Sequence, residues 1–215
     1  MKHSKLYLAS IIVFCALLEG CQTANETILV RPYHSVIQVR PLEVKSEDIK
    51  INPRSSWTNE GPVIFGIHPM TPIYRITIHH TAMPDDDEAD LGGSVKLRLQ
   101  KILYLHKHHQ NWADIGYHFI IDQNGNIWEG RSLKYQGAHA QGNNNLGNIR
   151  VALIGNFETH NAPEKQKKAL INFVHKKKKK YNVSDNNIFP HEHFTGTKCP
   201  GKNMIPLVNQ LRKGL

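Results

Sequence analysis

Histidine and cysteine side chains that can bind a metal are concentrated in two stretches of the sequence. His79 and His80 lie in "ITIHHTAMP", and the later stretch "HEHFTGTKCPG" holds His191, His193 and Cys199. A strand end holds a ligand rigidly, and a loop that ends in Cys-Pro-Gly can fold back to bring two ligands together. One imidazole from the first stretch, with one imidazole and the thiolate from the second, leaves the fourth position of a tetrahedral zinc ion for water. The pattern itself does not choose His79 over His80, or His191 over His193.

The N-terminal residues have the pattern of an export signal. Lys2 and Lys5 precede the apolar run "LYLASIIVFCALL", which is too short to span a bilayer comfortably. The run ends in "LEGC", which resembles a bacterial lipoprotein cleavage box. We therefore expect residues 1–20 to be a signal peptide, Cys21 to be lipidated, and residues 21–50 to form a tether or arm. Plain cleavage nearby, with Cys21 lost or free, is the alternative.

Cys199 would then be the single cysteine of the mature domain. Cys15 would leave with the signal and Cys21 would carry lipid, so no intramolecular disulfide is expected. A lone thiol in an exported protein calls for an explanation, and metal ligation supplies one. Gln22, directly after the lipidated cysteine, favours an anchor in the outer membrane that faces the periplasm.

The chain is basic, with a formal net charge of +9. Such an excess suits polyanionic surroundings, for example lipid headgroups or the carboxylates of a cell-wall polymer. Export makes nucleic acid the least suitable partner, and we expect a monomer that binds no nucleic acid. The lysine run at residues 176–180 is expected to be a solvated helix face.

The first half of the domain predicts a strand and then a helix. Residues 74–80 alternate as in a strand, so His79 and His80 point to opposite faces and only one of them can readily meet a given metal. Apolar residues at helical spacing follow, and Ser94 can cap that helix. His106 and His109 near its end form an i, i+3 pair that can chelate a metal, although such histidines more often serve as polar end residues.

The second half predicts a hairpin, a buried strand and two helices. Asn124–Gly125 predicts a tight turn between strands at residues 116–122 and 126–130, and the apolar run at 150–155 suits a strand covered on both faces. Helices are expected from Pro163–Glu164 onward and at residues 203–215. Together these elements predict a single α/β domain over residues 51–215, with a central mixed β-sheet flanked by helices.

Five motifs in a fixed order carry a resemblance to a known family. They are "ITIHHTAMP", "NWADIGYHFIIDQNGNIWEGR", "GAHAQGNNN", "VALIGNF" and "HEHFTGTKCPG". Together they resemble the zinc-dependent N-acetylmuramoyl-L-alanine amidases of the peptidoglycan recognition protein and phage lysozyme-amidase (type 2 amidase) superfamily, over about residues 51–215. The resemblance implies that family's fold, Zn²⁺ as the cofactor, and His79, His191 and Cys199 as its ligands. Because members without activity have usually lost a ligand, retention of all three favours an enzyme.

The resemblance also implies a reaction and the residues that serve it. The family hydrolyses the amide between N-acetylmuramic acid and L-alanine in peptidoglycan by a zinc-activated water. Tyr117 of the "DIGY" motif would reach that water or the developing oxyanion, and Thr197 would donate a hydrogen bond to the tetrahedral intermediate. The positions that would contact the substrate are His80, Thr81, His106, Trp112, His139 and Asn144.

Some residues depart from the family pattern. Asn111–Trp112 is a hybrid of the pairs found in diaminopimelate-preferring and lysine-preferring relatives, and Gln110 replaces an arginine, so the preferred stem peptide stays open. Glu192 follows the ligand histidine where many relatives carry arginine. Two rivals remain: a muropeptide-binding module that does not cleave, and a basic surface lipoprotein that sequesters zinc. A zinc peptidase is disfavoured because the sequence contains no HExxH.

Overall fold

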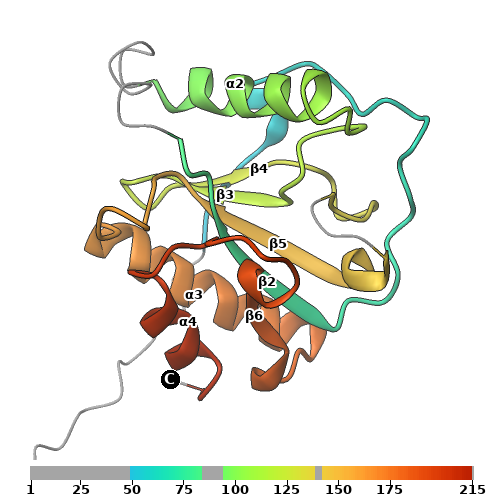
Figure 1. Ribbon diagram of the computed structural model, residues 1–215. Helices are drawn as coiled ribbons and strands as arrows, with labels where there is room; N and C mark the ends of the chain where they lie inside the picture. Colours follow the sequence, from blue (N-terminus) through green and yellow to red (C-terminus); the bar gives the residue numbers. More distant parts are fainter. Residues whose placement is uncertain (1–48, 84–93, 139–141, 215) are drawn as a thin grey trace, which may run out of the picture. The chain divides into compact units, whose positions relative to one another are not determined.

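The computed structural model describes residues 49–83, 94–138 and 142–214, and these form a mixed β-sheet with helices on both faces (Figure 1). The predicted α/β fold is therefore confirmed. The predicted signal peptide, Cys21 and His139 lie outside the described residues, as does nearly all of the tether. The strands are β1 (Ile51–Asn52), β2 (Arg75–His80), β3 (Phe119–Ile121), β4 (Ile127–Glu129), β5 (Asn148–Leu153) and β6 (Ile188–Pro190).

The strand order is β1-β4-β3-β5-β2-β6, and β3–β4 is the antiparallel pair. The other neighbours pair in parallel. β3 and β4 form the predicted hairpin, in which Gly125 takes a positive φ of 85° and donates its N–H to the carbonyl of Asp122. The carboxylate of Asp122 also accepts hydrogen bonds from the backbone N–H groups of Asn124 and Asn126, which orders the turn.

The helices cover the two faces of the sheet unequally. α2 (Val95–His108) lies on one face, and α3 (Glu164–Tyr181) and α4 (Ile205–Leu211) lie on the other (Figure 1). Ser94 caps α2 as predicted, because its hydroxyl accepts a hydrogen bond from the N–H of Leu97 at 3.4 Å. No helix in the described ranges combines the length and the apolar character that a bilayer crossing requires.

Alternation along the strands divides the core into two clusters. β5 is buried along its whole length, as predicted for a strand covered on both faces. The cluster under α3 and α4 includes Ile76, Ile78, Phe119, Val151, Leu153, Leu170 and Phe173. The cluster under α2 includes Leu99, Leu103, Ile115, Ile120 and Ile154. Ile76 and Ile78 therefore face α3, and His79, between Ile78 and His80 on the strand, points to the α2 side.

Two short strands were not predicted, and one of them matters for the candidate site. β6 adds three residues to the edge of the sheet, pairing Ile76 with Ile188 and Ile78 with Pro190. His191 therefore follows directly on a strand, whereas the sequence indicated only a loop. β1 is the second unpredicted strand, and β2 begins at Arg75 rather than at Tyr74.

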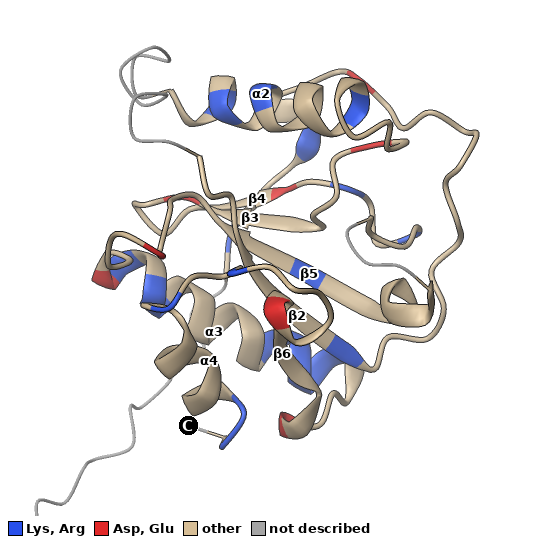
Figure 2. Cartoon of the chain, in the orientation of Figure 1, with Lys and Arg blue, Asp and Glu red and all other residues tan. Residues whose placement is uncertain are grey.

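The prediction of a solvated lysine face on α3 is wrong for one residue. Basic residues lie toward both ends of α3 (Figure 2). Lys177, however, is only 8% exposed, because it shares the inner stripe of the helix with Phe173. Its ammonium lies 4.4 Å from the ring centroid of Phe119 and 4.9 Å from that of Phe173. Burial lowers the pKa of Lys177 to about 8.

Replacement of Lys177 by Met should remove a pH dependence of stability. The pKa of Lys177 is about 8 in the folded protein and 10.5 ordinarily, so the unfolded state holds more protons between these values. The free energy of unfolding of the wild type should therefore rise relative to Lys177→Met as the pH increases through this window, by on the order of 1 kcal/mol. Urea denaturation at pH 7, 8, 9 and 10 measures the difference. Lys176→Met, at an exposed neighbouring position, is the control, and an equal pH effect in both variants would contradict the assignment.

Candidate metal centre and cavity

Three metal-binding side chains meet at the carboxyl ends of two neighbouring parallel strands. His79 is near the end of β2, His191 directly follows β6, and Cys199 reaches them from the loop beyond. One ligand atom of each lies within 4.8 Å of the others. The Cys199 sulfur is 3.7 Å from Nδ1 of His79, and the two imidazole centroids are 4.4 Å apart. Two nitrogens and one sulfur at this spacing are a donor set that fits zinc.

The neighbouring histidines have other contacts. Nδ1 of His80 accepts a hydrogen bond from the backbone N–H of Phe157 at 3.2 Å, so this ring turns toward the segment after β5. His193 stacks on Phe189 at a centroid distance of 4.5 Å and is exposed. The structure therefore brings His79 and His191, rather than His80 and His193, together with Cys199.

Backbone contacts hold the Cys199 loop against the sheet. The N–H of His80 donates to the Cys199 sulfur at 3.3 Å, and the N–H of Glu192 donates to the Cys199 carbonyl at 2.7 Å. Gly201 has a φ of 92°, and a Cβ at this position would lie 2.3 Å from the carbonyl carbon of Phe157. Only glycine permits this approach, which brings the loop into contact with the backbone of the segment after β5.

Burial sets the protonation of the three candidate ligands. It lowers the pKa of His79 well below its ordinary value and that of His191 to about 4, so both imidazoles are neutral at physiological pH. Neutral imidazole is the form that binds metals. Burial raises the pKa of the Cys199 thiol to about 12, against the opposing hydrogen bond from His80. A thiolate at this position therefore requires a cation beside it, and a divalent metal ion satisfies this requirement.

The three candidate ligands form one wall of a cavity of about 460 Å³. Five residues predicted to act in catalysis or substrate binding also line it: His80, Thr81, Trp112, Tyr117 and Thr197. Four lining residues had no predicted role: Ala82, Asn156, Glu158 and Lys198. Asn156 and Glu158 follow the carboxyl end of β5, where ligand sites of parallel sheets commonly form, and that position was the available signal.

Tyr117 and Thr197 each lie close to one of the candidate ligands. The Tyr117 ring centroid is 5.3 Å from that of His79. Burial, followed by the nearby Cys199, raises the pKa of Tyr117 well above its ordinary value, so the hydroxyl keeps its proton. The Thr197 hydroxyl accepts a hydrogen bond from the N–H of Cys199 at 3.3 Å, which orients it beside the thiol.

The remaining predicted substrate contacts have different positions. His106 is not among the lining residues; its Nδ1 accepts a hydrogen bond from the N–H of Gly116 at 3.1 Å. Its ring centroid lies 4.6 Å from that of Trp112 and 5.2 Å from that of Tyr117, so it packs against both of these lining residues. Asn144 lies in the short helix Gly142–Asn145 and is not among the lining residues; its carbonyl accepts a hydrogen bond from the Asn148 side chain.

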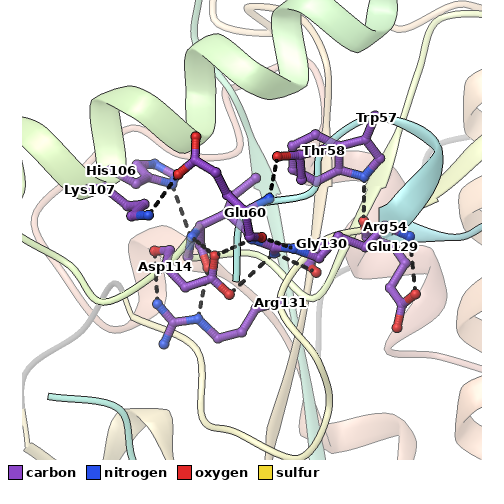
Figure 3. Close-up of polar contacts among 12 residues, drawn as sticks. Arg54, Trp57, Thr58, Glu60, His106, Lys107, Asp114, Glu129, Gly130 and Arg131 are labelled. Carbon is purple, nitrogen blue, oxygen red and sulfur yellow. Dashed lines mark hydrogen bonds and ion pairs between the residues drawn. The ribbon is translucent and has the colours of Figure 1, made fainter. Parts of the chain in front are cut away.

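An ion pair between half-buried Arg54 and buried Asp114 (Figure 3) fixes the loop that precedes Tyr117. The Arg54 guanidinium donates to both carboxylate oxygens of Asp114, at 2.7 and 3.2 Å, and to the carbonyl of Gly130. Arg131 donates to the carbonyls of Asp114 and Ile115 at 2.9 and 2.8 Å. The two arginines thereby attach the loop before Tyr117 to the segment after β4 and to the segment after β1.

Neutralising Asp114 should destabilise the fold strongly. Asp114→Asn leaves the half-buried Arg54 guanidinium without its anionic partner, and we expect a loss of about 3 kcal/mol in the free energy of unfolding. Chemical denaturation measures the loss. Glu60→Gln, which removes an exposed partner of Lys107, is the control and should cost less than about 1 kcal/mol. Similar losses in the free energy of unfolding of the two variants would show that the Arg54–Asp114 pair contributes no more than an exposed ion pair.

Loss of the Cys199 sulfur should abolish tight zinc binding. Changing residues that merely contact metal ligands typically costs 10- to 100-fold in affinity, so Cys199→Ala should weaken zinc binding by more than about 100-fold. Metal analysis of purified protein and competition with a chromophoric chelator measure this change. His193→Ala removes a nearby exposed imidazole and should retain one zinc per chain. Tight zinc binding by Cys199→Ala would contradict the assignment.

Comparison with known proteins identifies relatives over the same region. Residues 69–202 match the family described as N-acetylmuramoyl-L-alanine amidase. The chain is 32% identical over 187 residues to peptidoglycan-recognition protein SD of Drosophila melanogaster, which covers 81% of this chain and 92% of that protein.

Solved structures give the same result. The crystal structure of Drosophila peptidoglycan recognition protein SD is similar with a TM-score of 0.64 at 30% identity, covering 76% of this chain and 95% of that chain. The N-acetylmuramoyl-L-alanine amidase LysC from Clostridium intestinale is similar with a TM-score of 0.61 at 27% identity, covering 77% and 96%. Because the family match spans more than half of the chain, this protein belongs to the N-acetylmuramoyl-L-alanine amidase (type 2 amidase) family, within the superfamily of the peptidoglycan recognition proteins.

Proposed function

We propose that the chain is a zinc-dependent amidase that hydrolyses the bond between N-acetylmuramic acid and L-alanine in peptidoglycan. Family membership connects the chain with peptidoglycan, as a ligand or as a substrate. The observation that carries the finer proposal is the complete set of His79, His191 and Cys199, within 4.8 Å of one another in the wall of a cavity. A module that only recognised its ligand would not need three convergent metal ligands there.

The chain supplies a prepared site for the metal. Zinc, when bound, provides a Lewis acid and lowers the pKa of its water to about 7. His79 and His191 present neutral imidazoles because burial keeps their pKa values low. The sheet holds His79, while backbone N–H groups hold the Cys199 loop, so little reorganisation is required when a substrate enters.

Tyr117 and Thr197 are the proposed hydrogen-bond donors to the reacting amide. Tyr117 keeps its proton because burial raises its pKa, and it can donate that hydrogen to an oxygen that becomes negative. Thr197 accepts from the N–H of Cys199, and its own proton can be donated to a substrate oxygen. Both residues line the cavity that contains the candidate ligands.

Three further lining residues are proposed to position the substrate. Trp112 offers an aromatic ring, which packs against that of His106. His80 stays neutral, because burial lowers its pKa to about 4, and it can exchange hydrogen bonds with amide groups. The hydroxyl of Thr81 accepts a hydrogen bond from the N–H of Gly155 at 3.1 Å, which fixes its position at the cavity wall.

Recognition without cleavage is the second candidate function. It is favoured by one observation, which is that a relative with 32% identity is named as a recognition protein. Both candidates require muropeptide binding in the same cavity, and only the amidase requires release of a peptide with a free L-alanine N-terminus. Product analysis therefore separates them.

The cellular setting that suits either function is the cell envelope. The signal peptide over residues 1–20, the lipidation of Cys21 and the outer-membrane anchor stay predictions, as does the monomeric state. Export would bring the basic domain to the carboxylates of peptidoglycan.

Cleavage of a defined muropeptide tests the proposed reaction directly. Mass spectrometry of the products should show the free glycan and a peptide that begins with L-alanine, and a zinc chelator should prevent their formation. Tyr117→Phe should lower kcat by about 100-fold, as expected for the loss of one donor to an oxyanion. Tyr104→Phe, at an exposed position on α2, is the control and should keep full activity. Unchanged muropeptide after prolonged incubation with zinc-loaded wild type would leave only the recognition function.

A further inference from the structure

A lysine and a glutamate stand beside each other at the rim of the cavity. Lys198 precedes Cys199, and Glu158 lies on the segment after β5; both line the cavity. The ammonium of Lys198 is 3.7 Å from a carboxylate oxygen of Glu158. Among the described residues that line this cavity, Lys198 carries the one ammonium or guanidinium group.

The two partners are held very differently. The other carboxylate oxygen of Glu158 accepts a hydrogen bond from the backbone N–H of Lys202 at 3.1 Å, and its side chain is 28% exposed. The backbone of Lys198 is fixed, because its carbonyl accepts from the N–H of Gly201 at 2.6 Å. Its side chain is 81% exposed, so the ammonium is anchored at its base and open to solvent at its tip.

The pair contributes little to stability. A solvent-exposed ion pair with a long N–O separation stabilises a fold only slightly, and salt screens it. A carboxylate brought by a ligand can therefore replace Glu158 as the partner of Lys198 at small cost. In the free protein, the Glu158 carboxylate is the partner of the Lys198 ammonium.

We propose that Lys198 forms a subsite that binds a free carboxylate on the peptide side of the scissile amide, and that Glu158 occupies this subsite in the free protein. The inference rests on the proposed function, because it takes a peptidoglycan peptide as the ligand. A single ammonium beside Cys199 recognises the charge of a carboxylate, and a carboxamide at the same place offers no charge. Lys198 would thereby make the protein prefer stem peptides whose carboxylate is free.

Two matched muropeptides test this subsite. They differ only at the second stem residue, where one carries a carboxylate and the other a carboxamide. A second pair with the same change at the third residue locates the carboxylate that is recognised. Equilibrium dissociation constants by calorimetry, with zinc-loaded protein at 4 °C and products checked by mass spectrometry, give the preference of each variant.

In one of the two pairs, the wild type should bind the free acid about fivefold more tightly than the amide. The ratio of the two dissociation constants should be closer to one at high salt. Lys198→Met should reduce the ratio to about one, and Lys198→Glu should invert it. Glu158→Gln should strengthen binding of the acid and leave binding of the amide unchanged, an effect that a merely structural role would not produce. Lys202→Met, an exposed lysine that contacts Glu158 through its backbone, is the control and should keep the wild-type ratio.

The outcomes separate the subsite from the proposed function. Equal affinity of the wild type for the acid and the amide in both pairs overturns the proposed subsite alone. An acid-to-amide affinity ratio in Lys198→Met that equals that of the wild type does the same. Binding with the expected ratios but without cleavage supports the subsite and contradicts the amidase. Failure of the wild type to bind any of the four ligands overturns both proposals.

Discussion

The parallel pairing of β5, β2 and β6 is the constraint on which the candidate site depends. β2 runs between the other two strands, and its hydrogen bonds fix the register of both. That register brings His79 and His191 together at one edge of the sheet, although more than one hundred residues separate them in the chain. A shift of one residue in β2 would turn His79 toward α3 and dismantle the cluster.

The third candidate ligand depends on the same edge. Cys199 lies on a loop without regular structure, but the N–H of His80 reaches its sulfur and Gly201 presses its backbone against Phe157. The strand that carries one ligand therefore also positions another. The pair of half-buried Arg54 and buried Asp114 fixes the loop that leads to Tyr117, another residue that lines the cavity. Contacts outside the three candidate ligands therefore hold both loops in place, as a preorganised site requires.

Much of this arrangement could be predicted from local patterns. Alternation along β2 separated His79 from His80, the cap at Ser94 and the hairpin at Gly125 lie where expected, and the apolar run of β5 is buried on both faces. These features depend on the alternation of apolar residues and on cap and turn residues, which can be recognised within a few consecutive positions of the sequence. The choice of His79 and His191 as ligands came from the family resemblance, because two adjacent or nearly adjacent histidines look alike in a sequence.

Features that depend on distant contacts could not be predicted in this way. β6 has only three residues, and its pairing with β2 is visible only in the fold. Arg54 and Asp114 are 60 positions apart. Lys177 belongs to a run of like charges, yet the helical period places it over two aromatic rings. Lys198 and Glu158 come from separate loops, so neither one predicts the rim that they share.

X-ray absorption at the zinc edge measures whether His79, His191 and Cys199 together bind one zinc ion. For protein loaded with one equivalent of zinc, we expect a shell of two imidazole nitrogens at ~2.0–2.1 Å and one sulfur at ~2.3 Å, completed by an oxygen. Loss of the sulfur contribution in Cys199→Ala would identify its source. A first shell of nitrogen and oxygen alone in the wild type would show that Cys199 does not bind the zinc ion.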